Sequence, residues 1–304
     1  MMRIWKIWII GCAVLCVAAC GESDETRQQR AKAEQDKLDA ADRAALKVGV
    51  MPTLDCLPIY LLADSVLYDT TKVDIRLRPF TAQMDCDTAL FGGSVEGSVT
   101  DLVRVERLRR RGLPLKCVTS TNIHWQLIAN KKARLKDLSQ FGDKMVAMTR
   151  FSATDLLTDK AVKKGKPKYP VYKVQVNDVN IRLHMMQNDE IDAAWMAEPQ
   201  ATAARLAGHN MVTDSQQDSL RLGVVAFRVA VLADDKRDAQ VQEFLKAYNR
   251  AVDDINKKGV KHYAALIHKY MGMDETVAGK LPDVKYDQVR EPLQKDVAAA
   301  QQAF

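Results

Sequence analysis

The chain has 304 residues, 45 of them Lys or Arg and 39 Asp or Glu, and its net charge is +6 at pH 7. This mild excess is spread along the sequence, so it indicates no nucleic acid partner. The length allows one large domain or two lobes of ordinary size.

The first twenty residues have the pattern of a secretory signal. A basic start with Arg3 and Lys6 precedes an apolar run over residues 7–19, which is too short to span a bilayer. The run ends in Ala18-Ala19-Cys20, which resembles the bacterial lipobox, where the cysteine is acylated. We therefore expect a lipoprotein signal peptide over residues 1–20 and a membrane anchor on Cys20, facing the periplasm or the cell surface. The alternative is a chance match in an ordinary signal or a short membrane anchor.

Residues 21–43 are almost all charged, Gln or Ala, so they cannot bury a core. They predict a tether that is helical in part. An acidic sorting signal within residues 22–25 is the less favoured alternative.

From Leu46 onward, short apolar runs alternate with helical patterns, as a parallel α/β sheet requires. In a first group we predict strands at 46–50, 73–78, 97–99 and 115–118, and helices at 58–67, 85–91 and after residue 101. The pattern then restarts. Here we predict strands at 144–148, 171–176, 191–195 and 211–213, and helices at 135–138, 153–164 and 199–206, with a further helix capped by Asn177 or Asp178. Residues 125–129 and 223–232 predict two crossings between the groups, and a helical tail follows from Asp238.

Open α/β sheets bind ligands at the carboxyl ends of their strands, so the residues after each strand are candidates for a binding site. Thr53 and Asp55 follow the first strand, and Arg150, Ser152 and Thr154 follow the strand ending at Met148. Each set has a plainer interpretation, because Thr53, Asp55 and Ser152 could simply cap helices.

Glu198 stands between a buried strand and Pro199, where a helix begins. Glu is a poor N-cap, so its presence favours a functional role over a simple interaction with the helix dipole. Trp195 at the end of the same strand and Trp125 before the first crossing could stack on a ligand, with core packing as the alternative.

Three segments occur together in the order seen in a known family. Lys47–Thr53 with Pro58, Leu135–Leu138 with Gly142 and Lys144, and Asp192-Ala193-Ala194 with Glu198-Pro199 resemble the substrate-binding proteins of ABC importers of the nitrate/sulfonate/taurine and thiamine-precursor (NMT1-like) type. One segment departs from that pattern: residues 93–101 lack the family's usual Gly-x-Asp-Ala.

The resemblance implies a two-lobed type II periplasmic-binding-protein fold, with the two crossings as its hinge. Lobe I would comprise residues 44–127 and 226–304, and lobe II residues 128–225. It also implies a monomer that captures a small molecule between the lobes and delivers it to an ABC permease driven by an ATPase.

Three cysteines follow the signal, namely Cys56, Cys86 and Cys117. Their spacing matches no metal-ligand pattern, so we expect no metal site. Cys56 and Cys86 each follow a strand of the first group, which favours a disulfide between them over two free thiols. Cys117 lies within a predicted strand, so we expect it to be a small residue of the core.

No catalytic nucleophile motif, Walker motif or zinc-ligand spacing occurs, so we expect neither an enzyme nor a cofactor. An enzyme like the thiamine-pyrimidine synthases and a surface sensor without transport remain alternatives. The charge of the ligand is left open, and we favour a neutral or cationic nitrogen heterocycle over an anion. Carboxylates from Asp55, Asp155 and Glu198 would favour a nitrogen heterocycle, whereas Arg150 and Arg228 would favour a sulfonate-like anion.

Overall fold

A computed structural model describes residues 24–303, so the predicted signal peptide and Cys20 lie outside the described residues. The described chain divides into two compact units. In the first, the predicted tether forms one continuous helix, α1 (Asp24–Ala44), whose side chains are almost all exposed from Arg27 onward. No helix of the described chain is long and apolar enough to cross a membrane.

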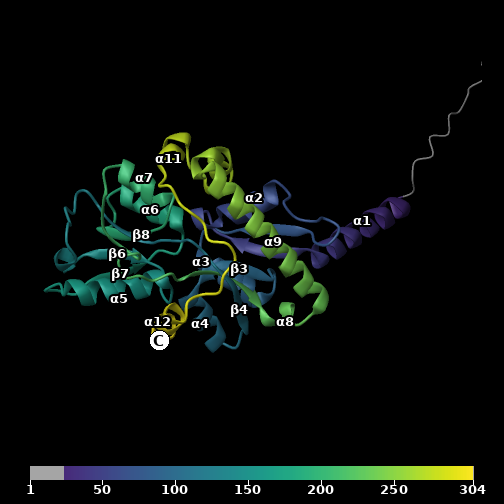
Figure 1. The fold of residues 1–304 in the computed structure, drawn as a ribbon, viewed down its shortest axis with the longest axis horizontal. Coiled ribbons are helices and arrows are strands. Elements are labelled where there is room, and N and C mark those ends of the chain that lie inside the picture. The colour runs from purple at the N-terminus through teal and green to yellow at the C-terminus, as the bar shows by residue number, and fades with distance from the viewer. Residues whose placement is uncertain (1–23, 304) are drawn as a thin grey trace, which may run out of the picture. The chain divides into compact units, whose positions relative to one another are not determined.

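The second unit, from Ala45 onward, contains two five-stranded sheets, each with helices on both faces (Figure 1). The first sheet has the order β2-β1-β3-β10-β4 and defines lobe I. Its strands are β1 (Leu46–Val50), β2 (Ile75–Pro79), β3 (Gly97–Asp101), β4 (Leu115–Ser120) and β10 (Gly223–Arg228).

The second sheet has the order β7-β6-β8-β5-β9 and defines lobe II. Its strands are β5 (Gln126–Ala129), β6 (Met145–Met148), β7 (Tyr172–Gln175), β8 (Ala193–Met196) and β9 (Asn210–Asp214). The two-lobed α/β fold is therefore confirmed. The predicted lobe boundaries, after residue 127 and after residue 225, fall inside β5 and β10, so we define the lobes by their sheets.

Both segments predicted as crossings contain a strand that is paired within a sheet. Residues 126–129 form β5 and residues 223–228 form β10, and each strand is antiparallel to both of its neighbours. The chain changes sheet within residues 121–125 and again within residues 215–222. Each sheet is thus mixed, because only the other pairs around β1 and β6 are parallel.

Helices cover both faces of each sheet, and alternation along the strands supplies both cores. In β10, Val225 and Phe227 pack into the cluster that holds α9, whereas Val224 and Ala226 pack into the cluster that holds α4. Beside lobe I lie α2 (Leu57–Asp64), α3 (Gln83–Gly92), α4 (Leu102–Arg110), α8 (Val229–Leu232), α9 (Asp235–Lys258), α10 (Ala264–Met271), α11 (Glu275–Lys280) and α12 (Gln294–Gln301). Beside lobe II lie α5 (Ala153–Gly165), α6 (Val179–Gln187) and α7 (Gln200–Leu206), with short 3₁₀ turns at Leu54–Cys56, Leu138–Phe141 and Val260–Tyr263.

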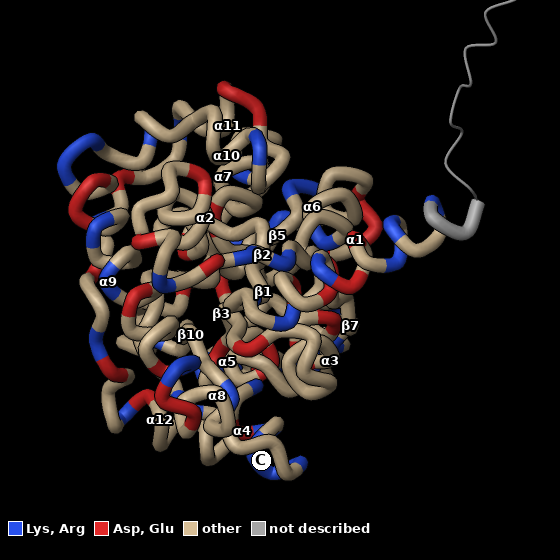
Figure 2. The backbone as a smooth tube through the Cα atoms, turned by 90° about the vertical axis from the view of Figure 1, so that its right-hand side faces the viewer, with Lys and Arg blue, Asp and Glu red and all other residues tan. Residues whose placement is uncertain are grey.

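The long helix α9 shows why the tail is helical. Phe244, Tyr248, Val252 and Ile255 recur at three- and four-residue spacing and are fully buried. The rest of its surface carries charges of both signs along its length (Figure 2).

The segment between α11 and α12 runs over the junction of the two lobes (Figure 1). We call residues 282–291 the strap. Asn122 of the first crossing donates to Lys285 O and accepts from Asp287 N, and Arg221 of the second crossing pairs with Asp287 at 2.8 Å. The strap therefore ties together both crossings that would serve as the hinge.

Candidate functional site

Two cavities lie where the lobes meet. We call the first the cleft pocket; it encloses about 440 Å³, open solvent at its mouth included. We call the second the hinge cavity; it encloses about 1410 Å³ on the same terms and lies beside the crossings and the strap. Ile123 lines both, so the first crossing separates them.

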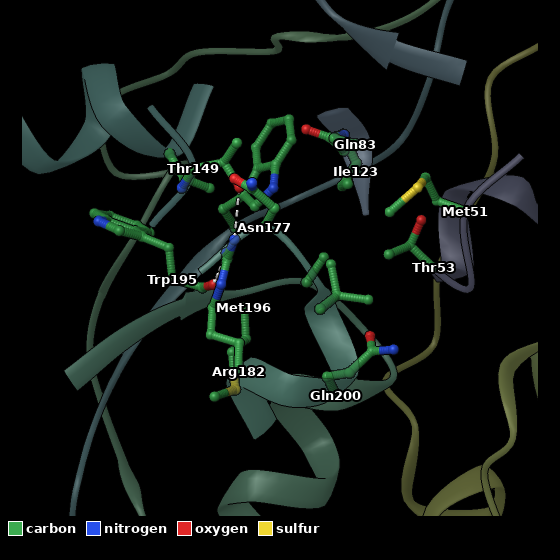
Figure 3. A pocket seen from close by; sticks show the side chains of 14 residues that line it. Met51, Thr53, Gln83, Ile123, Thr149, Asn177, Arg182, Trp195, Met196 and Gln200 are labelled. Atoms are coloured by element: carbon green, nitrogen blue, oxygen red, sulfur yellow. Dashed lines mark hydrogen bonds between the residues drawn. The ribbon is translucent and has the colours of Figure 1, made fainter. Parts of the chain in front are cut away.

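Many residues of the cleft pocket follow strands, as the strand-end rule predicts. Its polar walls come from both lobes (Figure 3). Lobe I contributes Thr53 and Gln83, and lobe II contributes Thr149, Thr154, Asn177, Arg182 and Gln200. Apolar surface comes from Met51, Val179, Met196 and Trp125.

Hydrogen bonds between the lobes hold this pocket closed. Leu54 N donates to Glu198 O at 2.7 Å, and Val179 N donates to Thr81 O at 3.1 Å. The amide nitrogen of Gln200 donates to Pro52 O at 2.9 Å. The structure therefore shows the lobes in a closed arrangement around the pocket.

Arg182 is the one charged residue that lines the cleft pocket in the described chain. Its guanidinium donates to Trp195 O at 2.7 Å, to Val176 O at 2.6 Å and to Thr149 Oγ1 at 2.8 Å, which fixes the ends of three neighbouring strands. Burial lowers the pKa of Arg182 to about 10, so it stays charged at neutral pH. The pocket is therefore positive, with no carboxylate in its described lining.

Gln200 offers the pocket a hydrogen-bond acceptor. Its Nε2 faces the carbonyl oxygen of Pro52, and this contact fixes the orientation of the amide. The opposite atom, Oε1, is buried and has no hydrogen-bond partner. A buried acceptor without a partner is costly, so a ligand donor at this position would relieve that cost.

Four of the predicted ligand residues line the cleft pocket and are buried: Thr53, Trp125, Thr154 and Trp195. Thr53 lies in the turn after β1, and Thr154 lies in the first turn of α5. The structure thus brings together residues that are about 100 positions apart in the sequence.

Two others after β6 do not line either cavity. Ser152 is buried and caps α5, where its Oγ accepts from Thr154 N at 3.1 Å and donates to Thr149 O at 2.7 Å. The plainer interpretation of Ser152 as a helix cap is therefore the one that the structure supports. Arg150 is exposed and lies outside both cavities.

Trp195 touches the pocket, but its ring belongs to the core of lobe II. Figure 3 shows the indole turned away from Met51 and Thr53. The side chain is 1% exposed and packs in the same cluster as Leu127 and Phe141. Strand alternation explains this, because Ala194 and Met196 on either side belong to the other cluster.

Glu198 and Asp55 line the hinge cavity instead of the cleft pocket. The Glu198 carboxylate accepts from Arg205 and Gln126 at 2.8 Å each, and from Thr202 N at 2.9 Å. These internal partners occupy the carboxylate. The interaction with the first turn of a helix, which was the alternative interpretation, is thus present.

Asp55 is 4% exposed, and its Oδ2 accepts from Thr121 Oγ1 at 2.9 Å. Its Oδ1 is buried without a hydrogen-bond partner. Burial raises the pKa of Asp55, and side-chain hydrogen bonds from Thr53 and Thr121 oppose that shift. The third candidate acid, Asp155, forms an ion pair with Lys173 at 2.8 Å and accepts a hydrogen bond from Phe151 N at 2.8 Å.

The predicted disulfide is absent, because Cys56 and Cys86 are both buried free thiols. Each is directed at Met51: Met51 N donates to Cys56 Sγ at 3.5 Å, and Cys86 Sγ lies 3.8 Å from Met51 Sδ. Burial raises the pKa of Cys86 to about 12, so this thiol is protonated. Cys117 is a half-buried free thiol packed against the core.

Several cleft residues were not predicted from the sequence. Gln83 and Asn177 follow β2 and β7, so the strand-end rule could have found them. Arg182 lies within α6 and Gln200 begins α7, where nothing in the local pattern marks a binding role. Within residues 24–303 no group of three or more His, Cys, Asp or Glu side chains could hold a metal ion.

Comparison with known proteins decides the family. A family model described as NMT1/THI5 like matches residues 54–259. The chain belongs to the NMT1/THI5-like family. A search of curated proteins gives no significant match to it.

Solved structures share the fold of this NMT1/THI5-like chain at low sequence identity. The alkanesulfonate-binding protein SsuA from Xanthomonas axonopodis pv. citri bound to MOPS has a TM-score of 0.71 at 18% identity, over 86% of this chain and 90% of that one. The periplasmic aliphatic sulphonate binding protein SsuA from Escherichia coli has 0.67 at 19%, over 85% and 89%. The periplasmic nitrate-binding protein NrtA from Synechocystis PCC 6803 has 0.68 at 11%, over 81% and 74%. The fold is thus that of a two-lobed periplasmic binding protein.

Proposed function

We propose that this chain is an extracytoplasmic solute-binding lipoprotein of an ABC-type importer. It captures a small organic solute in the cleft pocket and delivers it to a permease. The observation that carries the proposal is a closed pocket between two lobes in an NMT1/THI5-like chain. The signal and lipobox pattern at residues 1–20 supports export and lipid anchoring through Cys20.

The lining of the cleft pocket favours a solute with a strong acceptor group, such as a sulfonate-like anion. Arg182 supplies a buried positive charge, and hydroxyl and amide groups surround it. The printed names of two structural neighbours, which describe sulfonate-binding proteins, agree with this class. The free acceptor of Gln200 further requires a donor on the solute, such as N–H or O–H.

A nitrogen heterocycle similar to a thiamine precursor is the second candidate. Gln200 Oε1 would accept from a ring N–H or an amino group, and the buried indole of Trp125 offers a surface for stacking. The acids that would have held a cationic ring do not line the cleft pocket, which makes this candidate the weaker one.

A thermal-shift panel of sulfonates, pyrimidines and polyamines on the full chain tests the ligand class. A solute present at 100 times its Kd stabilises the folded protein by about 2.7 kcal/mol, which raises Tm measurably. We expect a sulfonate that also carries a hydrogen-bond donor to raise Tm most. If only pyrimidines raise Tm, the ligand is a nitrogen heterocycle and not an anion. If only polyamines raise Tm, both proposed ligand classes are wrong.

Two other functions are compatible with this fold and can be tested. An enzyme of the pyrimidine-synthase kind needs a lysine and a histidine as reagents, and neither residue type is in the described lining of the cleft pocket. Incubation with pyridoxal phosphate tests this, because an aldimine absorbance band would overturn the binding-protein proposal. A surface sensor without transport would be indicated if deletion of the gene left uptake of the bound solute unchanged.

A further inference from the structure

The hinge cavity is lined by several segments at the junction of the two lobes. The turn after β1, the first crossing, the start of α7, the second crossing and the strap all contribute side chains. Its walls include apolar surface from Leu54, Met211 and Val284. The cavity could therefore hold a small molecule with a short apolar body beside its polar groups.

Its charges do not cancel. Glu198 pairs with Arg205, and Asp287 pairs with Arg221. Asp283 also has a partner, Lys261, at 3.8 Å. Once these pairs are set aside, the cavity lining has two further acids, Asp55 and Asp214, and one further lysine, Lys285. Burial lowers the pKa of His124, so this residue adds no positive charge at neutral pH.

Asp55 gives this acidic lining a specific anchor. The Asp55 side chain is 4% exposed. Thr121 donates a hydrogen bond to Oδ2 and not to Oδ1. Oδ1 has no hydrogen-bond partner in the described chain. A buried carboxylate oxygen in that state lacks a donor, and a cationic donor would satisfy both its hydrogen-bonding need and its charge.

We propose that the hinge cavity is a second binding site, distinct from the cleft pocket, for a small primary ammonium compound whose ammonium group is held by Asp55. The two sites are separate because Asp55 does not line the cleft pocket, and the Leu54–Glu198 backbone hydrogen bond joins the lobes beside it. The two sites also differ in chemistry, since the cleft pocket is positive and the hinge cavity is acidic.

Calorimetric titration of the full chain in mild detergent with butylammonium chloride tests this site. Butan-1-ol has the same apolar chain without the charge and serves as the ligand control. We expect butylammonium to bind with one-to-one stoichiometry and butan-1-ol to bind at least tenfold more weakly. The wild-type titration alone can overturn the proposal. It does so if the two compounds bind with equal affinity, or if butylammonium does not bind to the folded protein.

Two variants then locate the anchor. Asp55→Asn keeps the shape of the side chain and removes its charge, and we expect it to weaken butylammonium binding at least tenfold. Asp283→Asn removes the same charge from a side chain that is 94% exposed and lies 3.8 Å from Lys261, so it should weaken binding less than threefold. Equal losses in the two variants would show that general negative charge, and not Asp55, attracts the amine. Thermal unfolding of each variant confirms that it is folded, and neither result depends on which solute the cleft pocket takes.

Discussion

Glu198 illustrates at the residue scale how a carboxylate can be conspicuous in the sequence and still serve the structure. Its position before Pro199 predicted a ligand contact, but Arg205, Gln126 and Thr202 N occupy its oxygens. The sequence could not show this, because Gln126 is 72 positions away and joins the site only through the pairing of β5 with β8.

We therefore expect Glu198→Ala to act on stability more than on binding. This substitution removes one partner of the mostly buried Glu198–Arg205 pair, which should lower the free energy of unfolding by about 1–3 kcal/mol. The loss is reduced because part of the Arg205 side chain is exposed to solvent. Affinity for the cleft solute should change less than threefold. Urea denaturation and solute titration measure the two effects. Glu190→Ala, a substitution of an exposed acid nearby in the sequence, serves as the control, with a change within about 0.5 kcal/mol. A large loss of affinity with unchanged stability would restore the original hypothesis.

Residues that follow a strand were predictable because strand ends meet at one edge of a sheet. Thr53 and Thr154 were found in this way. The direction of a side chain was less predictable: Trp195 ends a strand as expected, yet its ring points to the core. A single sequence gives the register of a strand only when one face is visibly polar, and β8 is buried on both.

At the scale of the elements, the start of α4 links the lobes. Asp101 ends β3 and caps α4 by accepting from Arg104 N at 3.0 Å, and it also lies against the backbone N–H of Ala153 at the start of α5. Burial raises the pKa of Asp101 to about 6, with the charge of Arg104 opposing the shift. The folded protein therefore binds a proton at Asp101 more readily than the unfolded chain does.

This raised pKa predicts a stability that falls with pH. Between the unfolded value of 3.8 and the folded value of about 6, the folded state holds the extra proton, so stability is lost as pH rises through that window. Asp101→Asn keeps a capping side chain and does not titrate. Urea denaturation of both proteins should show the wild type losing up to about 3 kcal/mol relative to the variant between pH 4 and pH 7. A difference that stays constant or grows with pH would contradict the raised pKa.

Gly223 marks a close approach at the start of β10. A Cβ atom at this position would overlap Ile123 Cγ2 and Thr121 Oγ1, which belong to the other crossing. We expect Gly223→Ala to lower the free energy of unfolding by about 1–3 kcal/mol through overpacking. Gly279 in α11 has open space around it, so Gly279→Ala should be neutral or stabilising by up to about 1 kcal/mol. Equal effects in chemical denaturation would show that the crossings are not tightly packed.

Most helices and strands were predictable from apolar periodicity, because their buried faces follow the helical or strand repeat. The helix predicted at residues 135–138 is one exception, because the structure has a 3₁₀ turn at Leu138–Phe141 instead. Two further exceptions are β5 and β10. Their apolar runs have no period that separates a connecting segment from a strand buried on both sides, and only the pairing with neighbours decides. The charged segment before β1 was predicted to be helical in part, and the structure extends that helix over the whole of Asp24–Ala44.

At the scale of the whole molecule, the two lobes meet around the cleft pocket, and backbone hydrogen bonds join them there. The ordered motifs in the sequence predicted this two-lobed arrangement through resemblance to a family. The composition of the pocket was not predictable in the same way, because its walls combine first turns of helices from both lobes with Arg182 from within α6.

The central claim is that one solute contacts both lobes in the cleft pocket. Titration of the best solute from the thermal-shift panel should compare Thr53→Val from lobe I and Asn177→Ala from lobe II with the wild type. The exposed Thr88→Val serves as the control. The account predicts that each cleft substitution weakens binding of the same solute at least fivefold, while Thr88→Val leaves it unchanged. Loss of affinity from one lobe alone, or from neither, would contradict capture between the lobes.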